Sequence, residues 1–144
     1  MITLEQLEDL FASIDRAGAW DMTRPMLWGY FFTDRSAEKL EGLIAPLTDR
    51  GCRFVDIFEA EVPEGTPAYF FLHVEKAEVH TARSLFARNA ELYALADEHR
   101  IDAYDGMDVG PVPSSLLTTV IVPWPAHARR GQITDNSPTR KPHT

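Results

Sequence analysis

The chain has 144 residues, which is enough for one domain, and 44% of them are hydrophobic, which is enough for an ordinary buried core. No apolar run approaches the ~18–20 residues needed to cross a bilayer, so no membrane association is expected. The start of the chain shows no secretory signal pattern, and a single cysteine, Cys52, excludes an internal disulfide. These features predict a cytoplasmic protein.

The formal net charge of −8 is unevenly distributed along the chain. Residues 1–125 hold 21 acidic and 10 basic side chains, whereas residues 126–144 hold 1 acidic and 4 basic side chains. An acidic body repels phosphates, which disfavours direct nucleic-acid binding and suits a basic protein partner, although the same charge also serves simple solubility. We predict a single domain over 1–125 and a flexible polar tail over 126–144.

The first half of the chain shows a helix, a strand and a second helix. Leucines at helical spacing predict an amphipathic helix over about 3–17, closed by Gly18. The stretch 26–33 is apolar on both faces, as is typical of a central strand. A helix is then expected over about 34–49, with Pro46 distorting its last turns.

The second half adds three strands and a helix. Alternation predicts a strand over 52–61, and the turn-rich stretch 62–67 predicts a hairpin that leads into a strand over 68–79. Thr81 is expected to cap the next helix, and a last strand is expected over about 101–109. Within that strand, an Asp-Gly pair signals a turn or a bulge.

A helix followed by βαββαβ is typical of a ferredoxin-like α+β sandwich. In that fold the first and third strands lie in the middle of the sheet, which gives the strand order 4-1-3-2. The two most apolar strands of this chain are the first and the third, so composition agrees with that order. The β-prone stretch 116–122 could add a C-terminal strand at an edge, pack over the open face of the sheet, or pair with a second chain.

Two motifs carry a resemblance to a known family. The helix ends in Leu-Tyr-Ala-Leu-Ala at 92–96, and Tyr-Asp-Gly follows at 104–106. Over about 26–111 the chain resembles the regulator of ribonuclease E activity B (RraB-like) family. The resemblance implies a small cytoplasmic protein that is not an enzyme, has a ferredoxin-like fold, needs no cofactor and restrains RNA decay by binding the protein scaffold of ribonuclease E. Better-known members carry an acidic C-terminal tail, whereas the tail here is net positive.

The candidate site is an acidic surface that pairs with arginine or lysine side chains of a protein partner. We expect it near the turn at 104–108. Asp105 is also a candidate for capping backbone N–H groups. The predicted partner-binding residues are Glu75, Asp102, Tyr104, Asp105 and Asp108. No catalytic residue and no metal ligand is predicted.

Metal and nucleophile chemistry receive weak support from the sequence. His73 and Glu75 would share one face of their strand and Glu78 and His80 the other, so the four side chains do not converge on one ion. No HExxH, CxxC or Gly-x-Ser-x-Gly motif is present. Cys52 begins an apolar strand, which is typical of a small core residue.

The aromatic side chains of the first and third strands leave alternatives open. They could line a pocket on the open sheet face of a dimeric enzyme or small-ligand binder, or they could stack RNA bases. We favour a covered face, with the N-terminal helix, the stretch 116–122 or a second chain as the cover. A homodimer therefore stays open. The proposed pocket lining is Trp28, Tyr30, Tyr69, Phe71 and His73.

Overall fold

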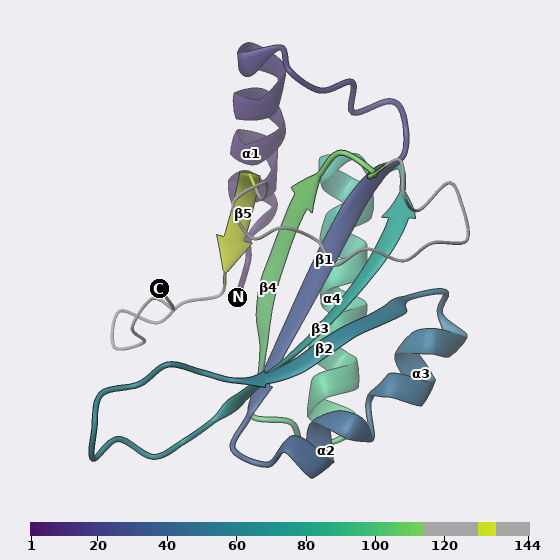
Figure 1. Ribbon diagram of the computed structural model, residues 1–144. Helices are drawn as coiled ribbons and strands as arrows, with labels where there is room; N and C mark the ends of the chain where they lie inside the picture. The colour runs from purple at the N-terminus through teal and green to yellow at the C-terminus, as the bar shows by residue number, and fades with distance from the viewer. Residues whose placement is uncertain (114–129, 135–144) are drawn as a thin grey trace.

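The computed structural model describes residues 1–113 and the backbone of residues 130–134. Both helices and strands are present along the chain (Figure 1). Among the described residues, no helix is both long and apolar enough to cross a membrane. The elements are α1 (Leu4–Ala17), β1 (Met26–Asp34), α2 (Ala37–Glu41), α3 (Ile44–Asp49), β2 (Arg53–Glu59), β3 (Phe70–Glu78), α4 (Ala82–Glu98), β4 (Ala103–Gly110) and β5 (Arg130–Thr134).

The strands form one sheet in the order β2-β3-β1-β4-β5, and neighbouring strands are antiparallel. Without β5, the order of the strands from β4 to β2 is 4-1-3-2. Every residue of β1 is buried, and this strand lies between β3 and β4. β2 lies at the end of the sheet, and its residues are exposed or half-buried.

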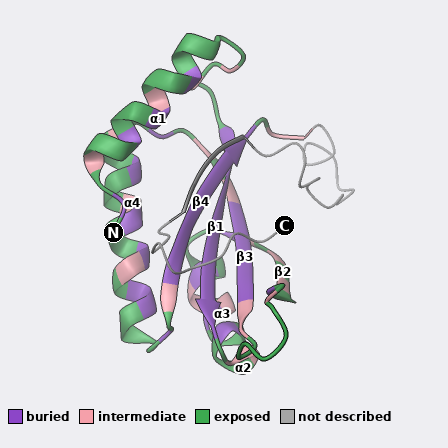
Figure 2. Ribbon diagram, turned by 90° about the vertical axis from the view of Figure 1, so that its left-hand side faces the viewer, coloured by how far each residue is buried: buried purple, intermediate pink, exposed green. Residues whose placement is uncertain are grey.

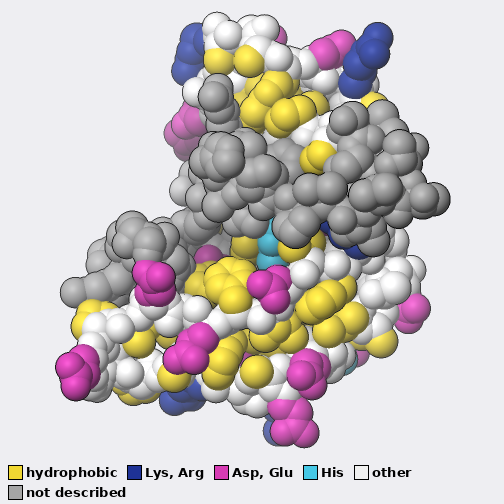
Figure 3. Space-filling view, in the orientation of Figure 1, with side chains coloured by type: hydrophobic (Ala, Val, Ile, Leu, Met, Phe, Trp, Pro, Cys, Tyr) yellow, Lys and Arg dark blue, Asp and Glu magenta, His cyan; other side chains and the backbone are white. Residues whose placement is uncertain are grey.

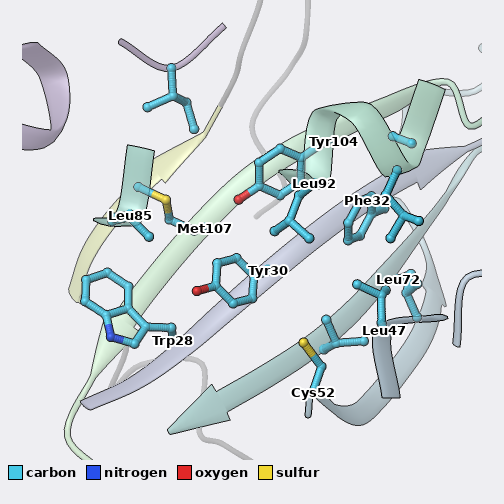
Figure 4. Close-up of a cluster of buried hydrophobic side chains, with 14 of the residues drawn as sticks. Trp28, Tyr30, Phe32, Leu47, Cys52, Leu72, Leu85, Leu92, Tyr104 and Met107 are labelled. Atoms are coloured by element: carbon cyan, nitrogen blue, oxygen red, sulfur yellow. The ribbon is translucent and has the colours of Figure 1, made fainter. Parts of the chain in front are cut away.

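The helices gather on one face of the sheet. Figure 2 shows α4 lying along that face, with α1 at its upper end and α2 and α3 near its lower end. β1 directs alternate side chains into this layer, where Trp28, Tyr30 and Phe32 are fully buried (Figure 4). Phe11 of α1 stacks on Trp28 at 6.0 Å between ring centroids. The N-terminal helix therefore belongs to the helical layer, where it covers one end of the aromatic stripe of β1. The expectation that it could cover the opposite, open face of the sheet was wrong.

Capping residues in the sequence correctly predicted where the two long helices, α1 and α4, begin. Thr3 and Gln6 form the capping box of α1, and Gly18 ends the helix in the left-handed conformation, at φ 69°. The helix expected over 34–49 is instead two short helices that are separated at Gly42. Pro46 lies in the first turn of α3, where its missing N–H has no intrahelical acceptor, so the break precedes the proline rather than following from it.

The Asp-Gly pair of β4 forms a bulge, the second of the two expected alternatives. Gly106 lies opposite Phe31 and Tyr104 lies opposite Phe32, which leaves Asp105 as an extra residue between them. Gly106 has φ 135°, a conformation that other residues rarely adopt. The expectation of a surface turn at 104–108 was therefore wrong, because this stretch is a buried strand.

The sheet has an added C-terminal strand, β5, but it lies at 130–134 and not in the expected stretch 116–122. β5 pairs with β4, with Ile133 opposite Met107. It falls within the stretch 126–144 that was expected to be a polar tail, and its only aliphatic residue is Ile133, so its strand pattern is weak. The β-prone stretch 116–122 lies outside the described residues. The domain boundary at residue 125 stays a prediction.

Candidate functional site

The five residues predicted to bind a partner do not form one exposed surface in this structure. Tyr104 is 1% exposed and its hydroxyl donates to Asn89 Oδ1 of α4 at 2.7 Å, so its side chain lies in the helical layer. Glu75 and Asp108 both lie opposite Gly29 in the sheet, on the other face. Asp105 occupies the bulge and is buried. The assignment of these residues to partner binding stays a prediction.

Asp102 is the exposed member of the set and takes part in a clamp between two loops. Its backbone N–H donates to Asp34 Oδ2 at 2.9 Å, and its carboxylate accepts from the backbone N–H of Arg35 at 3.1 Å. Burial opposes ionisation of Asp34, but N–H donors from Ser36 and Asp102, with the Lys39 ammonium, lower the pKa of Asp34. The clamp ties the end of β1 to the start of β4.

The face of the sheet opposite the helices carries a cluster of buried polar side chains above Gly29. A Cβ atom on Gly29 would lie 2.3 Å from Asp108 Oδ1 and 2.9 Å from His73 Nε2, so both side chains approach the backbone closely there. The His73 ring also stacks on Phe31, at 4.3 Å between centroids. Glu75 pairs with Arg53 of β2. Gly29 is therefore required for close packing rather than for a special backbone angle.

We expect Gly29→Ala to destabilise the fold by about 1–3 kcal/mol, because the added methyl group displaces two packed side chains. Urea denaturation followed by circular dichroism measures the loss. A double-mutant cycle with Asp108→Ala supplies the control: the cost of Gly29→Ala should shrink when the Asp108 carboxylate is absent. Equal costs in both backgrounds would show that Asp108 is not the obstacle.

The predicted pocket lining is divided between the two faces of the sheet, which corrects the sequence analysis. Trp28 and Tyr30 project into the helical layer. Phe71 packs with Phe31 and Tyr69 on the opposite face, in a smaller apolar cluster. These side chains cannot line one pocket, because a strand turns successive residues to opposite faces and the proposal combined both sets.

A second polar cluster lies where β3 meets α4. Arg88 donates to both carboxylate oxygens of Glu78, at 2.6 and 3.1 Å, and the Tyr30 hydroxyl donates to Glu78 at 3.1 Å. His80 Nε2 lies 3.0 Å from the same carboxylate. Burial opposes ionisation of Glu78, but hydrogen bonds from His80 and Arg88 lower its pKa to about 2. Burial also raises the pKa of Tyr30.

This second cluster has a structural explanation. Ser84 Oγ lies 2.8 Å from His80 Nδ1, so serine, imidazole and carboxylate are arranged in a chain. However, Ser84 Oγ accepts from the Thr81 N–H at 2.8 Å and donates to the Thr81 carbonyl at 3.2 Å, as part of the α4 cap. Its hydroxyl is thereby committed to the helix start. In the described part of the chain, no group of three or more His, Cys, Asp or Glu side chains is placed to hold a metal ion.

The exposed functional candidates lie on β2 and the hairpin after it. Phe54 and Phe58 are 42% and 36% exposed, and exposed carboxylates follow them along the chain. From Phe54 to Glu75 the chain has five carboxylates and no lysine or arginine. Figure 3, which views the sheet from the side opposite α4, shows acidic and hydrophobic side chains interleaved. Asp56 and Phe58 lie on this side of the sheet, whereas Phe54 and Glu59 pair with Val74 and Phe70 and lie on the helical side of the same edge strand. We call the exposed side chains along both sides of this edge and its hairpin the β2 surface: Phe54, Asp56, Phe58, Glu59, Glu61 and Glu64.

Sequence reasoning missed the β2 surface because it judged edge strands by their charges alone. The available signal was the presence of two phenylalanines in a strand expected at the end of the sheet. A ring in an edge strand has neighbours on one side only, so it is less completely covered than a ring in a central strand, and the pair pointed to an exposed aromatic surface.

A comparison with models of known protein families shows the family to which this chain belongs. The model described as Regulator of ribonuclease activity B matches residues 4–109, which is most of the chain. The chain belongs to this family. No curated protein and no solved structure matches it. The resemblance drawn from the sequence is thus confirmed, and the match begins earlier, at α1.

The RraB match covers most of the described helices and strands. It covers α1 through nearly all of β4, so the β2 surface and both polar clusters lie inside the family region. β5 lies beyond it. The RraB family is one of regulators of ribonuclease activity, which implies action through a protein partner.

Proposed function

We propose that this RraB-family chain is a non-catalytic regulator that restrains RNA cleavage by binding ribonuclease E or its protein scaffold through an acidic surface. Membership of the family supports the regulatory role. The strand order and the antiparallel pairing support a ferredoxin-like scaffold extended by α1 and β5. The proposal includes action in the cytoplasm and requires no cofactor.

The observation that carries this proposal is the composition of the β2 surface. Its carboxylates are exposed, and no basic side chain of the same segment neutralises them. Carboxylates of this kind accelerate encounter with a basic partner and pair with its arginine or lysine side chains. Exposed phenylalanines supply the apolar contact on which binding energy depends. A partner segment that combines positive charge with apolar side chains therefore matches this surface.

Charge reversal tests the proposal. We expect the triple variant Asp56→Lys, Glu59→Lys, Glu61→Lys to bind full-length ribonuclease E about 10–100-fold more weakly than the unmodified chain, because three attractive contacts become repulsive. Binding is measured by biolayer interferometry at low and moderate salt concentration.

The matched control reverses three exposed carboxylates of α1: Glu8→Lys, Asp9→Lys, Asp15→Lys. Both triple variants change the net charge equally, so only the position of the change differs. The control should keep most of the affinity. Equal losses in the two variants would contradict a localised surface and indicate a general charge effect.

RNA binding is the alternative function, and the charge of the β2 surface disfavours it. Phe58 and Phe71 stack at 5.2 Å between centroids on the face opposite the helices, an arrangement that could receive a base. However, the Asp56 carboxylate lies on the same face and would repel the phosphate backbone. A strong, steeply salt-dependent affinity of the isolated protein for single-stranded RNA would reverse this preference.

A further inference from the structure

We propose that the outer edge of β2 receives an extended, basic segment of the partner protein as an additional strand of the sheet. This inference rests on the proposed function and specifies where and in what form the partner binds. Strand addition combines backbone hydrogen bonds, which give affinity, with side-chain contacts on alternate residues, which give specificity. It requires a free strand edge and suitable side chains on both sides of it.

No strand of the described residues pairs with the outer edge of β2. β2 ends the sheet and pairs only with β3 among the described strands. The Ala60 N–H donates to the Tyr69 carbonyl at 2.9 Å, so the backbone of residue 60 points inward. Along an antiparallel strand, the backbone groups of successive residues point alternately toward the paired strand and away from it. Phe58, two residues before Ala60 and paired with Phe71, therefore also directs its N–H and C=O toward β3. The N–H and C=O groups of Ile57 and Glu59 therefore point away from the sheet.

The side chains beside this edge favour a basic and apolar segment. Asp56 and Phe58 pair with His73 and Phe71 of β3, so their side chains lie on the face of the sheet away from the helices. An added strand would place alternate side chains next to this carboxylate and this ring. Arginine and lysine suit both neighbours, because each pairs with carboxylates and packs its stem or its cation on an aromatic ring.

The same charges disfavour a second copy of this chain at the edge. An antiparallel pair of β2 strands would bring the carboxylates of one copy, Asp56 and Glu59, close to those of the other. Like charges facing each other across strands are destabilising. Arg53, the only basic residue of β2, is already paired with Glu75. A basic foreign segment is therefore the occupant that the edge fits best.

Amide hydrogen exchange of the full-length chain, resolved by NMR, tests the inference. The probe is a blocked synthetic peptide of about ten residues in which arginine and valine alternate. In the free protein the outward amides of Ile57 and Glu59 should exchange quickly, whereas those of Phe58 and Ala60 should exchange slowly. With saturating peptide, exchange at Ile57 and Glu59 should slow by about tenfold or more. A peptide with glutamate in place of arginine should have no effect.

Three results would overturn the inference. The first is no binding of the arginine peptide at millimolar concentration, and the second is binding that leaves Ile57 and Glu59 unprotected. The third is concentration-dependent protection of these two amides in the free protein, which would identify a second copy as the occupant. A different result would contradict the proposed function alone: the peptide protects the edge of β2, but the chain does not bind ribonuclease E.

A proline variant separates backbone pairing from charge. Glu59→Pro removes one outward N–H and leaves the inward bonds of β2 unchanged, because proline is tolerated at a strand edge. Glu59→Gln removes only the charge. Peptide affinity should fall by a larger factor in Glu59→Pro than in Glu59→Gln. Equal factors, with both variants melting as the unmodified protein does, would contradict strand addition.

Discussion

The Trp28→Ala variant should lose about 3–5 kcal/mol of the free energy of unfolding, the largest effect that we expect from a single substitution. Trp28 is fully buried between the sheet and the helical layer. Its ring stacks on Phe11 of α1 and meets the His80 ring edge-on at 5.3 Å. Its Nε1 donates to the Glu78 carbonyl at 3.0 Å. Removing the ring leaves a cavity where α1 joins the core. Urea denaturation followed by far-ultraviolet circular dichroism measures the loss.

Trp28→Phe is the matched control for this substitution. It keeps a six-membered ring but removes the Nε1 donor, so we expect a smaller loss of about 1–2 kcal/mol. Both variants lose the Nε1 hydrogen bond, so the difference between them measures the packing contribution of the six-membered ring that Trp28→Phe retains. A cost below about 1 kcal/mol for Trp28→Ala would contradict the packing of α1 against the sheet.

The Arg88→Met variant should lose about 3 kcal/mol of the free energy of unfolding at neutral pH. Methionine keeps the apolar stem of the side chain but removes both hydrogen bonds to Glu78. Only 16% of the Glu78 side chain is exposed, so solvent cannot fully replace those bonds. Thermal and urea denaturation, compared between the variant and the unmodified protein, measure the effect.

The pH dependence of this loss checks its cause. The Glu78 pKa is lowered from 4.5 to about 2 in the folded protein, so its ionised form stabilises the fold fully above pH 4.5. That contribution disappears as the pH falls toward about 2. The stability difference between Arg88→Met and the unmodified protein should therefore narrow over this interval. Stability curves that stay parallel below pH 4.5 would show that Arg88 does not lower the Glu78 pKa.

The features that the sequence predicted well depend on local chemistry. The capping box at Thr3, the terminating Gly18 and the apolar run that became β1 each identify an element from a few neighbouring residues. The apolar character of the first and third strands also anticipated that β1 and β3 lie inside the sheet. Such signals survive in the folded protein because tertiary packing reinforces them. The fourth strand was expected at an edge, but β4 lies between β1 and β5.

The candidate site was harder to predict, because it depends on pairing between distant strands. Whether Phe71 faces the helices or the open side follows from its register with Thr33 of β1, which no local pattern specifies. The bulge at Asp105 shifts the register again, so the carboxylates of β4 cannot be assigned to a face by counting. The sequence therefore assigned the docking role mainly to carboxylates near β4, a strand that is largely buried, and that assignment stays a prediction.

The most direct test of the account is the rate at which full-length ribonuclease E cleaves a defined RNA substrate in the presence of this chain. The unmodified chain and the control with reversed charges on α1 should slow cleavage. The variant with reversed charges at Asp56, Glu59 and Glu61 should leave the rate close to that of the ribonuclease alone. Unchanged cleavage with the unmodified chain, or equal inhibition by both charge-reversed variants, would contradict regulation through the β2 surface.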